Sequence, residues 1–366
     1  MSVAINGTDG ITYNDGSVQP SAPVGRNLII NGDMAIDQRN VGASATSNGS
    51  VYTVDRFEFQ MSSVTNVQTY QQVTDAPAGF NKSLKITNNS TTQATAAGVL
   101  CTPRQKIEGL NTAYLNWGTS DAQTVTVSFW VKASVTGTYP VALTNNNFSR
   151  SFVTNYTVSV ANTWEYKTVT IAGDTSGTWT VDTTTGINVL FSLDTGSTYQ
   201  TTAGSWQAGN YRGTSSDVHF LANASATWQI TGVQLEANTT ATPFENLQYT
   251  TQLQLCQRYL PAFSGISNWF GFGIIINTSR LFSTATYKVP TRVAPTGLVI
   301  SSASHFQCGD MIATSNLASA ISISSSGTDS ALLDVTSSVA NLTAARPGVV
   351  VATSASALLY FTGCEL

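Results

Sequence analysis

Charged side chains are scarce in this sequence: Asp, Glu, Lys and Arg make up 10% of the 366 residues, against roughly 25% in typical soluble domains. The 16 basic and 20 acidic residues leave a net charge of -4, without a long run of one sign. We therefore expect neither a nucleic-acid partner nor insertion into a membrane. Thr, Ser and Asn fill the polar positions and predict a neutral, hydrogen-bonding surface.

Histidine is rarer still, with only His219 and His305. No GxSxG, HExxH, Walker or GxGxxG motif follows a predicted strand, so the signatures of acyl transfer, zinc hydrolysis and phosphate binding are missing. Asp174, Asp182 and Asp194 leave one enzymatic alternative, a carboxylate pair flanking a glycosidic bond. Solvated turn carboxylates explain the same residues, and we expect that the protein is not an enzyme.

Cysteines and long apolar runs are also few. The four cysteines lie far apart without a CxxC pair, which argues against zinc and redox motifs, and we expect them to be buried. No stretch approaches the ~20 apolar residues of a membrane span, and the first residues lack the basic and apolar regions of a signal peptide. The expectation is a chain that is neither Sec-exported nor embedded in a membrane.

What the sequence does contain is a succession of short strand patterns. Residues 1–26 form a Gly-, Asn-, Asp- and Pro-rich arm whose short apolar pieces, Val3–Ile5 and Ile11–Tyr13, are expected to pair with another chain. Residues 27–246 carry strand after strand, starting with Leu28–Ile30, without helical periodicity between them, which predicts an all-β sandwich.

One helix is expected between Pro243 and Pro261, where Tyr249, Leu253, Cys256 and Leu260 recur at helical spacing. It makes residues 247–262 a helical connector. Strand patterns resume from residue 263 to residue 366 with few charges, which predicts a smaller C-terminal β-sandwich whose apolar surface is covered by copies of itself.

The strand Trp228–Glu236 closes the first sandwich. Trp228 and Ile230 alternate with polar residues, and Val233 and Leu235 continue in the opposite phase after Gly232. Such a slip predicts a β-bulge at this glycine, because one extra residue turns later side chains to the other face.

Loop aromatic residues are the candidates for glycan binding, because the C–H faces of sugars stack on aromatic rings. Those in loop or strand-end sequence are Trp179, Tyr199, Trp206, Tyr211 and Trp269. For each of them, a ring that pins its own loop is the structural alternative. Asp33 and Asp37 are the candidate metal ligands, for calcium in particular, although a dense DxDxDG loop is missing.

Ordered sequence blocks then point to a family. Asn27–Arg39 with Tyr52–Phe57, Ser128–Lys132 with Thr163–Lys167, and a closing block of Trp228–Glu236, Ala241–Glu245 and Leu255–Tyr259 together resemble a domain of tailed-bacteriophage tail fibres. That domain is similar to the galactose-binding-like jelly rolls of carbohydrate-binding modules. Those modules commonly hold calcium through an Asp pair in the closing strand, where this chain departs with Thr231-Gly232.

The resemblance implies a homotrimeric receptor-binding protein of a virion tail. Its residues 1–26 would attach to other tail or baseplate proteins, its jelly roll would span residues 27–246, and a β-sandwich tip would follow the connector. It would attach to a host surface polysaccharide and need no cofactor. Two alternatives stay open, a head fibre, decoration or adaptor protein that binds no sugar, and a polysaccharide depolymerase.

Overall fold

The computed structural model describes residues 4–6, 10–12, 18–19, 25–89, 92–265, 269–310 and 314–366. The chain divides into two compact units. We call residues 1–35, 44–51 and 58–247 the jelly-roll unit, and residues 36–43, 52–57 and 248–366 the C-terminal unit. Within the described ranges no helix has the length and apolar character needed to span a membrane. The domain boundaries expected from the sequence stay a prediction.

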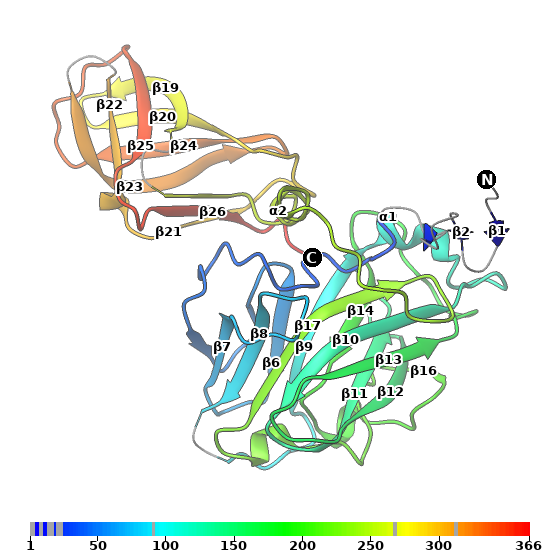
Figure 1. Ribbon diagram of the computed structural model, residues 1–366. Helices are drawn as coiled ribbons and strands as arrows, with labels where there is room; N and C mark the ends of the chain where they lie inside the picture. Colours follow the sequence, from blue (N-terminus) through cyan, green and yellow to red (C-terminus); the bar gives the residue numbers. More distant parts are fainter. Residues whose placement is uncertain are drawn as a thin grey trace. The chain divides into compact units, whose positions relative to one another are not determined.

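The jelly-roll unit contains two sheets, as expected for a β-sandwich (Figure 1). One has six strands, in the order β13 (Glu165–Ile171), β10 (Val125–Ala133), β17 (Thr227–Glu236), β8 (Ser83–Asn88), β7 (Gln68–Val73) and β4 (Ala45–Ser47). The other runs β16 (Trp206–Ala208), β12 (Arg150–Val158), β11 (Gly137–Thr144), β14 (Thr185–Phe191), β9 (Leu100–Glu108), β6 (Phe57–Ser62) and β5 (Val51–Tyr52), and β15 (Asp194–Thr195) pairs with β9. Short helical segments between strands are α1 (Gly109–Thr112), η1 (Ala113–Leu115), η2 (Ser197–Tyr199) and η3 (Phe220–Ala222).

Aromatic rings fill the core of this sandwich. Phe129 packs edge-on against Phe191 and Tyr156, with ring centroids 5.1 and 5.0 Å apart. Trp228 is fully buried, and its Nε1–H donates to the Tyr156 hydroxyl at 3.1 Å. The one polar hydrogen of the indole is thereby satisfied, so the ring stabilises the core by burial without the cost of an unpaired donor.

The predicted bulge in the closing strand is confirmed. The register between β10 and β17 shifts between Ser128 and Trp130, and Gly232 has a φ of 62°. Left-handed backbone of this kind favours glycine because it brings no Cβ clash. The extra residue keeps the apolar side chains before and after it buried.

The first residues of the sandwich are hydrogen-bonded to its last strand and to the segment that follows it. Asn27 Oδ1 accepts the N–H of Leu235 at 3.0 Å, and Asn27 Nδ2 donates to the carbonyl of Val233 at 3.1 Å. Glu245 accepts the backbone N–H of Asn27 at 2.8 Å. The prediction of a strand at Leu28–Ile30 is wrong, because this segment bonds to β17 through isolated hydrogen bonds and side chains rather than through a continuous ladder.

In the N-terminal arm, the described pieces pair with one another, and their pairing with another chain stays a prediction. Three short strands, β1 (Ala4–Asn6), β2 (Gly10–Thr12) and β3 (Val18–Gln19), form one antiparallel sheet. Val3 and Tyr13, at the ends of the apolar pieces expected from the sequence, lie outside the described residues.

The C-terminal unit consists mainly of β-strands around a closed barrel (Figure 1). Six strands close it, in the order β19 (Trp269–Asn277), β20 (Arg280–Thr286), β24 (Ser330–Ser337), β23 (Ser315–Ser326), β22 (Phe306–Asp310) and β25 (Pro347–Ala352). A three-stranded sheet of β18 (Ala262–Ser264), β26 (Leu358–Thr362) and β21 (Gly297–Ile300) accompanies the barrel, with η4 (Ala303–His305) before β22. The strands expected after residue 263 are therefore present, and the main sheet that they form closes on itself, which removes two exposed edges.

The expected helix is also present as α2 (Tyr249–Gln257), which lies in the C-terminal unit. Its buried face differs from the prediction, because Gln252, Cys256 and Gln257 are buried while Tyr249 is 63% exposed. All four cysteines are buried free thiols, as predicted.

Two short segments from the first sixty residues complete the C-terminal unit. Arg39 is ion-paired with Glu365, and the Tyr52 hydroxyl donates to the carbonyl of Leu366. The Arg56 guanidinium lies 3.6 Å above the ring centre of Tyr259. Since buried charges are costly without partners, these pairs fix the segments to the end of the chain.

Candidate functional site

The outer face of the larger jelly-roll sheet is covered by the chain itself. Ala142, Val153 and Leu190 on that face are fully buried, and Tyr211 packs against them. Every residue of β14 is buried. A face of this kind offers a ligand no open platform.

The part of the chain that contains Tyr211 covers this face, and we call it the covering segment. Arg212 anchors it. It is 2% exposed, donates to the Gln60 side chain and to Asn210 Oδ1, and lies over Phe148, 4.4 Å from the ring centre, with Tyr199 at 5.8 Å. Burial and the neighbouring Arg104 lower the pKa of Arg212 to about 10. Tyr199 and Tyr211 were both expected to stack on a ligand. Tyr211 instead packs on the covered sheet face, and Tyr199 lies beside the Arg212 guanidinium.

Trp179 and Trp206 are in contact with each other, which the sequence alone did not predict. With Trp117 they form a cluster of mutually perpendicular rings, 4.7 to 5.4 Å between centroids. Trp206 also packs against Phe152 at 5.5 Å and donates to the carbonyl of Ala172 at 2.8 Å. Edge-to-face packing of this kind pins loops, and it leaves the ring faces partly occupied.

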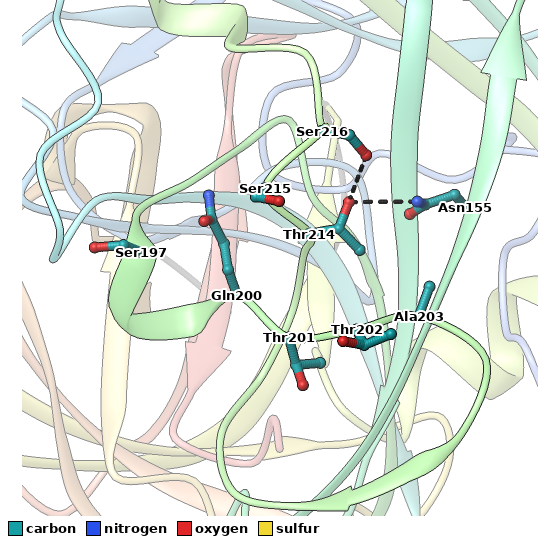
Figure 2. Close-up of a pocket in the computed structure, with 9 residues that line it drawn as sticks. All are labelled: Asn155, Ser197, Gln200, Thr201, Thr202, Ala203, Thr214, Ser215 and Ser216. Atoms are coloured by element: carbon teal, nitrogen blue, oxygen red, sulfur yellow. Dashed lines mark hydrogen bonds between the residues drawn. The ribbon is translucent and has the colours of Figure 1, made fainter.

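A polar cavity of about 620 Å³ opens beside the covering segment (Figure 2). Asn155 Nδ2 donates to the Thr214 hydroxyl at 3.3 Å, and Thr214 lies 3.1 Å from the Ser216 hydroxyl. The remaining lining side chains are Ser197, Gln200, Thr201, Thr202, Ala203 and Ser215. This lining can exchange hydrogen bonds with a neutral ligand, and it contains neither an aromatic ring nor a charge.

The outer face of the smaller sheet carries a different pocket, of about 420 Å³, which we call the aromatic pocket. Trp130 of β10 and Tyr166 of β13 are cross-strand partners whose ring centroids lie 5.3 Å apart, and Tyr166 is 45% exposed. Phe80 and Phe244 form the other wall, 5.1 Å apart. Ser128, Gly232, Ala241, Thr242 and Pro243 complete the lining. Few polar groups among many aromatic ones are typical of small-molecule sites.

The bulge makes room for this pocket. A Cβ on Gly232 would lie 2.6 Å from Phe80 Cζ and 3.1 Å from Trp130 Cδ1. The wall that contains Phe244 is held by buried Glu236, whose carboxylate accepts the N–H and the hydroxyl of Thr242 at 2.8 and 2.7 Å. The closing sequence block thus positions an aromatic ring.

A polar group neighbours the aromatic pocket, since Lys132 follows Trp130 by two residues on the same face of β10. Lys132 pairs with Asp75 at 2.6 Å, and Asp75 also accepts from Trp164 Nε1 and Gln229 Nε2 at 3.3 and 3.2 Å. The Lys132 hydrogen bond, above all, lowers the pKa of Asp75. Hydrogen-bonding groups therefore lie beside a stacking surface.

The remaining candidates lie elsewhere. Trp269 is 57% exposed on β19 of the C-terminal unit and stacks on Phe272 at 6.2 Å. Asp33 accepts the N–H of Ala35 at 3.4 Å. Asp37 accepts the N–H groups of its own turn, and burial raises the pKa of both carboxyls. Among the residues that the structure describes, no group of three or more His, Cys, Asp and Glu is placed to hold a metal. The metal-binding role stays a prediction.

Sequence reasoning missed Trp130 and Tyr166 as site residues, although the signal was present. In β10 the apolar residues at odd positions face the core, which puts Trp130 on the outer face. Solvent-facing positions of a sheet are usually polar. Two large aromatic residues at neighbouring solvent-facing positions therefore indicate a ligand-binding surface better than loop composition does.

Several solved structures are similar to this chain. The CBM22-1 xylan-binding domain of Paenibacillus barcinonensis Xyn10C has 10% identity and a TM-score of 0.27, over 60% of this chain and 100% of its own. The family 11 carbohydrate-binding module of Clostridium thermocellum Lic26A-Cel5E has 13% identity and a TM-score of 0.27, over 60% and 99%. The CBM22-1-CBM22-2 tandem of the same Paenibacillus enzyme has 10% identity and a TM-score of 0.28, over 94% and 97%. No family model and no curated protein matches the sequence.

Proposed function

We propose that the protein binds a cell-surface glycan through the aromatic pocket and acts as an adhesion protein without catalytic activity. The observation that carries the proposal is the pair of half-buried Trp130 and exposed Tyr166 on an otherwise polar sheet face. Two rings tilted by 47° present surfaces for the C–H face of a sugar. Lys132 and Asp75 supply a donor and an acceptor for its hydroxyls.

Binding of neutral oligosaccharides and of purified host polysaccharide, followed by tryptophan fluorescence and calorimetry, tests this site. Trp130→Ala is expected to weaken binding at least tenfold. The matched control, Trp179→Ala, removes a tryptophan from the cluster with Trp117 and Trp206, none of which lines the aromatic pocket, and should leave affinity unchanged. Equal affinities of the wild-type and Trp130→Ala proteins would refute the site.

The sequence blocks that resemble tail-fibre domains support a place in a virion tail, with residues 1–26 attaching to other tail proteins. A homotrimer would multiply a weak sugar affinity through effective concentration. Competition between the purified protein and phage for host adsorption tests the role, and light-scattering mass tests the trimer. A stable monomer would contradict the trimer, and location on the capsid would favour a head fibre or adaptor.

The proposal of a binding protein also has a chemical test. Of the carboxylates that could flank a glycosidic bond, Asp174 is buried and paired with Arg150 at 2.7 Å, and Asp194 accepts from Thr95 at 2.7 Å and lies 3.1 Å from His219 Nδ1. Both hold structure together. Release of reducing ends from capsule or lipopolysaccharide by the purified protein would show a depolymerase instead.

A further inference from the structure

A third cavity, of about 350 Å³, lies wholly within the C-terminal unit. We call it the lysine pocket. Tyr249 of α2 and Trp269 of β19 line it and are 63% and 57% exposed, and Phe263 of β18 adds a third ring. Exposed aromatic side chains that cluster around a cavity are uncommon on a protein surface and are typical of an interaction site. They provide the stacking surfaces that a pyranose ring or a similar flat ligand needs.

The lysine pocket is lined by one acidic and one basic side chain, Asp37 and Lys288, and only Lys288 is available to a ligand. Asp37 accepts the N–H groups of Asn40 and Gly42 at 3.1 and 2.9 Å, so both of its oxygens hold the turn in place, and Arg39 lies nearby to offset its charge. Lys288 is exposed, with its Nζ 6.0 Å from the Phe263 ring centre. No ion pair joins Lys288 to any residue in the described ranges.

Polar side chains complete the pocket wall. Gln257 is 3% exposed, and its Nε2 donates to Gln38 Oε1 at 3.3 Å. Both amides line the cavity together with Ser264. A neutral, hydrogen-bonding wall with one available ammonium group is matched to a ligand that carries hydroxyls and one negative charge. A phosphate-rich ligand would need several cations, and the lining supplies only Lys288.

We propose that the lysine pocket binds an acidic sugar, a pyranose with a carboxylate such as a hexuronate. Its carboxylate contacts Lys288, its C–H face stacks on Trp269, and its hydroxyls meet Gln38 and Gln257. This site is separate from the aromatic pocket and does not depend on the function proposed for it.

Calorimetry on the full chain tests this site, with methyl glucuronide and methyl galacturonide as probes and the corresponding methyl glucoside and galactoside as neutral controls. The acids are expected to bind at least tenfold more tightly at low salt, and the difference should shrink as salt screens the charge. Lys288→Met should reduce the acids to the affinity of the neutral sugars, whereas Lys85→Met in the jelly-roll unit should change nothing. Trp269→Ala should weaken acids and neutral sugars alike.

Equal binding of acidic and neutral sugars, or binding of neither, would overturn the proposal, as would an unchanged affinity in Lys288→Met. A rise in light-scattering mass that Trp269→Ala abolishes, without sugar binding, would show that the rings contact a second copy instead. The Trp130→Ala protein should keep full acid binding. If it loses acid binding, the aromatic pocket is the acid site and the lysine pocket is not.

Discussion

The two sheets of the jelly-roll unit use aromatic residues in opposite ways. On the outer side of the larger sheet, Tyr199 and Tyr211 pack against their own protein and hold a covering segment in place. On the outer side of the smaller sheet, Trp130 and Tyr166 line a pocket. The same residue types thus serve stability on one face and offer a ligand platform on the other, and what separates them is whether chain covers the face.

The largest effect is expected where rings serve packing alone, in the tryptophan cluster that lies on the same face of the larger sheet as Phe152. Trp206→Ala removes a ring that packs against Trp117, Trp179 and Phe152. We expect the free energy of unfolding to fall by about 3 kcal/mol, in the range for large aromatic truncations, with glycan affinity unchanged. Urea denaturation measures it, and Trp206→Phe, which retains a ring, should lose less than half as much. A stable Trp206→Ala protein that no longer binds glycan would reverse the comparison.

On the open side the expected effect is on affinity. Tyr166→Ala should weaken glycan binding about tenfold, or about 1.4 kcal/mol, because it removes one stacking surface. Since the ring is 45% exposed, the free energy of unfolding should change by no more than about 0.5 kcal/mol. Tyr166→Phe separates ring from hydroxyl and should bind nearly as well as the wild type. A larger loss of stability than of affinity would mean that Tyr166 is structural.

Gly232 links the fold to the open face, and its substitution should affect both. Gly232→Ala forces a left-handed backbone on a residue with a Cβ, at a cost of about 1 kcal/mol, and places that atom 2.6 Å from Phe80. We expect slightly lower stability by calorimetry and a several-fold weaker glycan affinity. Gly204→Ala, also at positive φ but with open space around its Cβ, is the control, and it should lose stability alone.

Local periodicity in the sequence was enough to predict three features. Period-two alternation predicted the sandwich strands and the bulge, and helical spacing predicted the helix. It missed β9, which contains Pro103, Arg104 and Lys106. A strand buried on both faces that carries charges shows no alternation, and Glu58 compensates those charges through ion pairs at 3.0 and 2.9 Å. The partner is 46 residues away from Arg104, so no local pattern reveals it.

The candidate site was predictable only in part for a related reason. Loop composition led to Trp179, Tyr199, Trp206 and Tyr211, and the fold then packed those rings against other elements. Whether a loop aromatic faces solvent or another ring is decided by tertiary contacts. The facing positions of Trp130 and Tyr166 follow from register, which the bulge and the neighbouring strands fix together.

The smallest expected effect concerns two carboxyls, one on each side. Asp75 on the open side has a lowered pKa, chiefly because of the Lys132 hydrogen bond, whereas burial raises the pKa of Asp217 beside the polar cavity. A lowered folded-state pKa adds stability that is present above 3.8, the ordinary value, and is lost as pH falls through the folded pKa. A raised pKa does the reverse, so Asp217 costs stability at neutral pH and this cost disappears as pH falls from its raised pKa to 3.8.

Carboxyl titrations followed by NMR should therefore show midpoints on opposite sides of 3.8, lower for Asp75 and higher for Asp217. Lys132→Met should move the Asp75 midpoint upward and leave Asp217 where it is. An Asp217 midpoint at the ordinary value of 3.8 would mean that the covering segment opens in solution, because a solvated Asp217 would lose the burial that raises its pKa. The covered face would then be available to a ligand, and the contrast between the two sheets would hold only for the closed form.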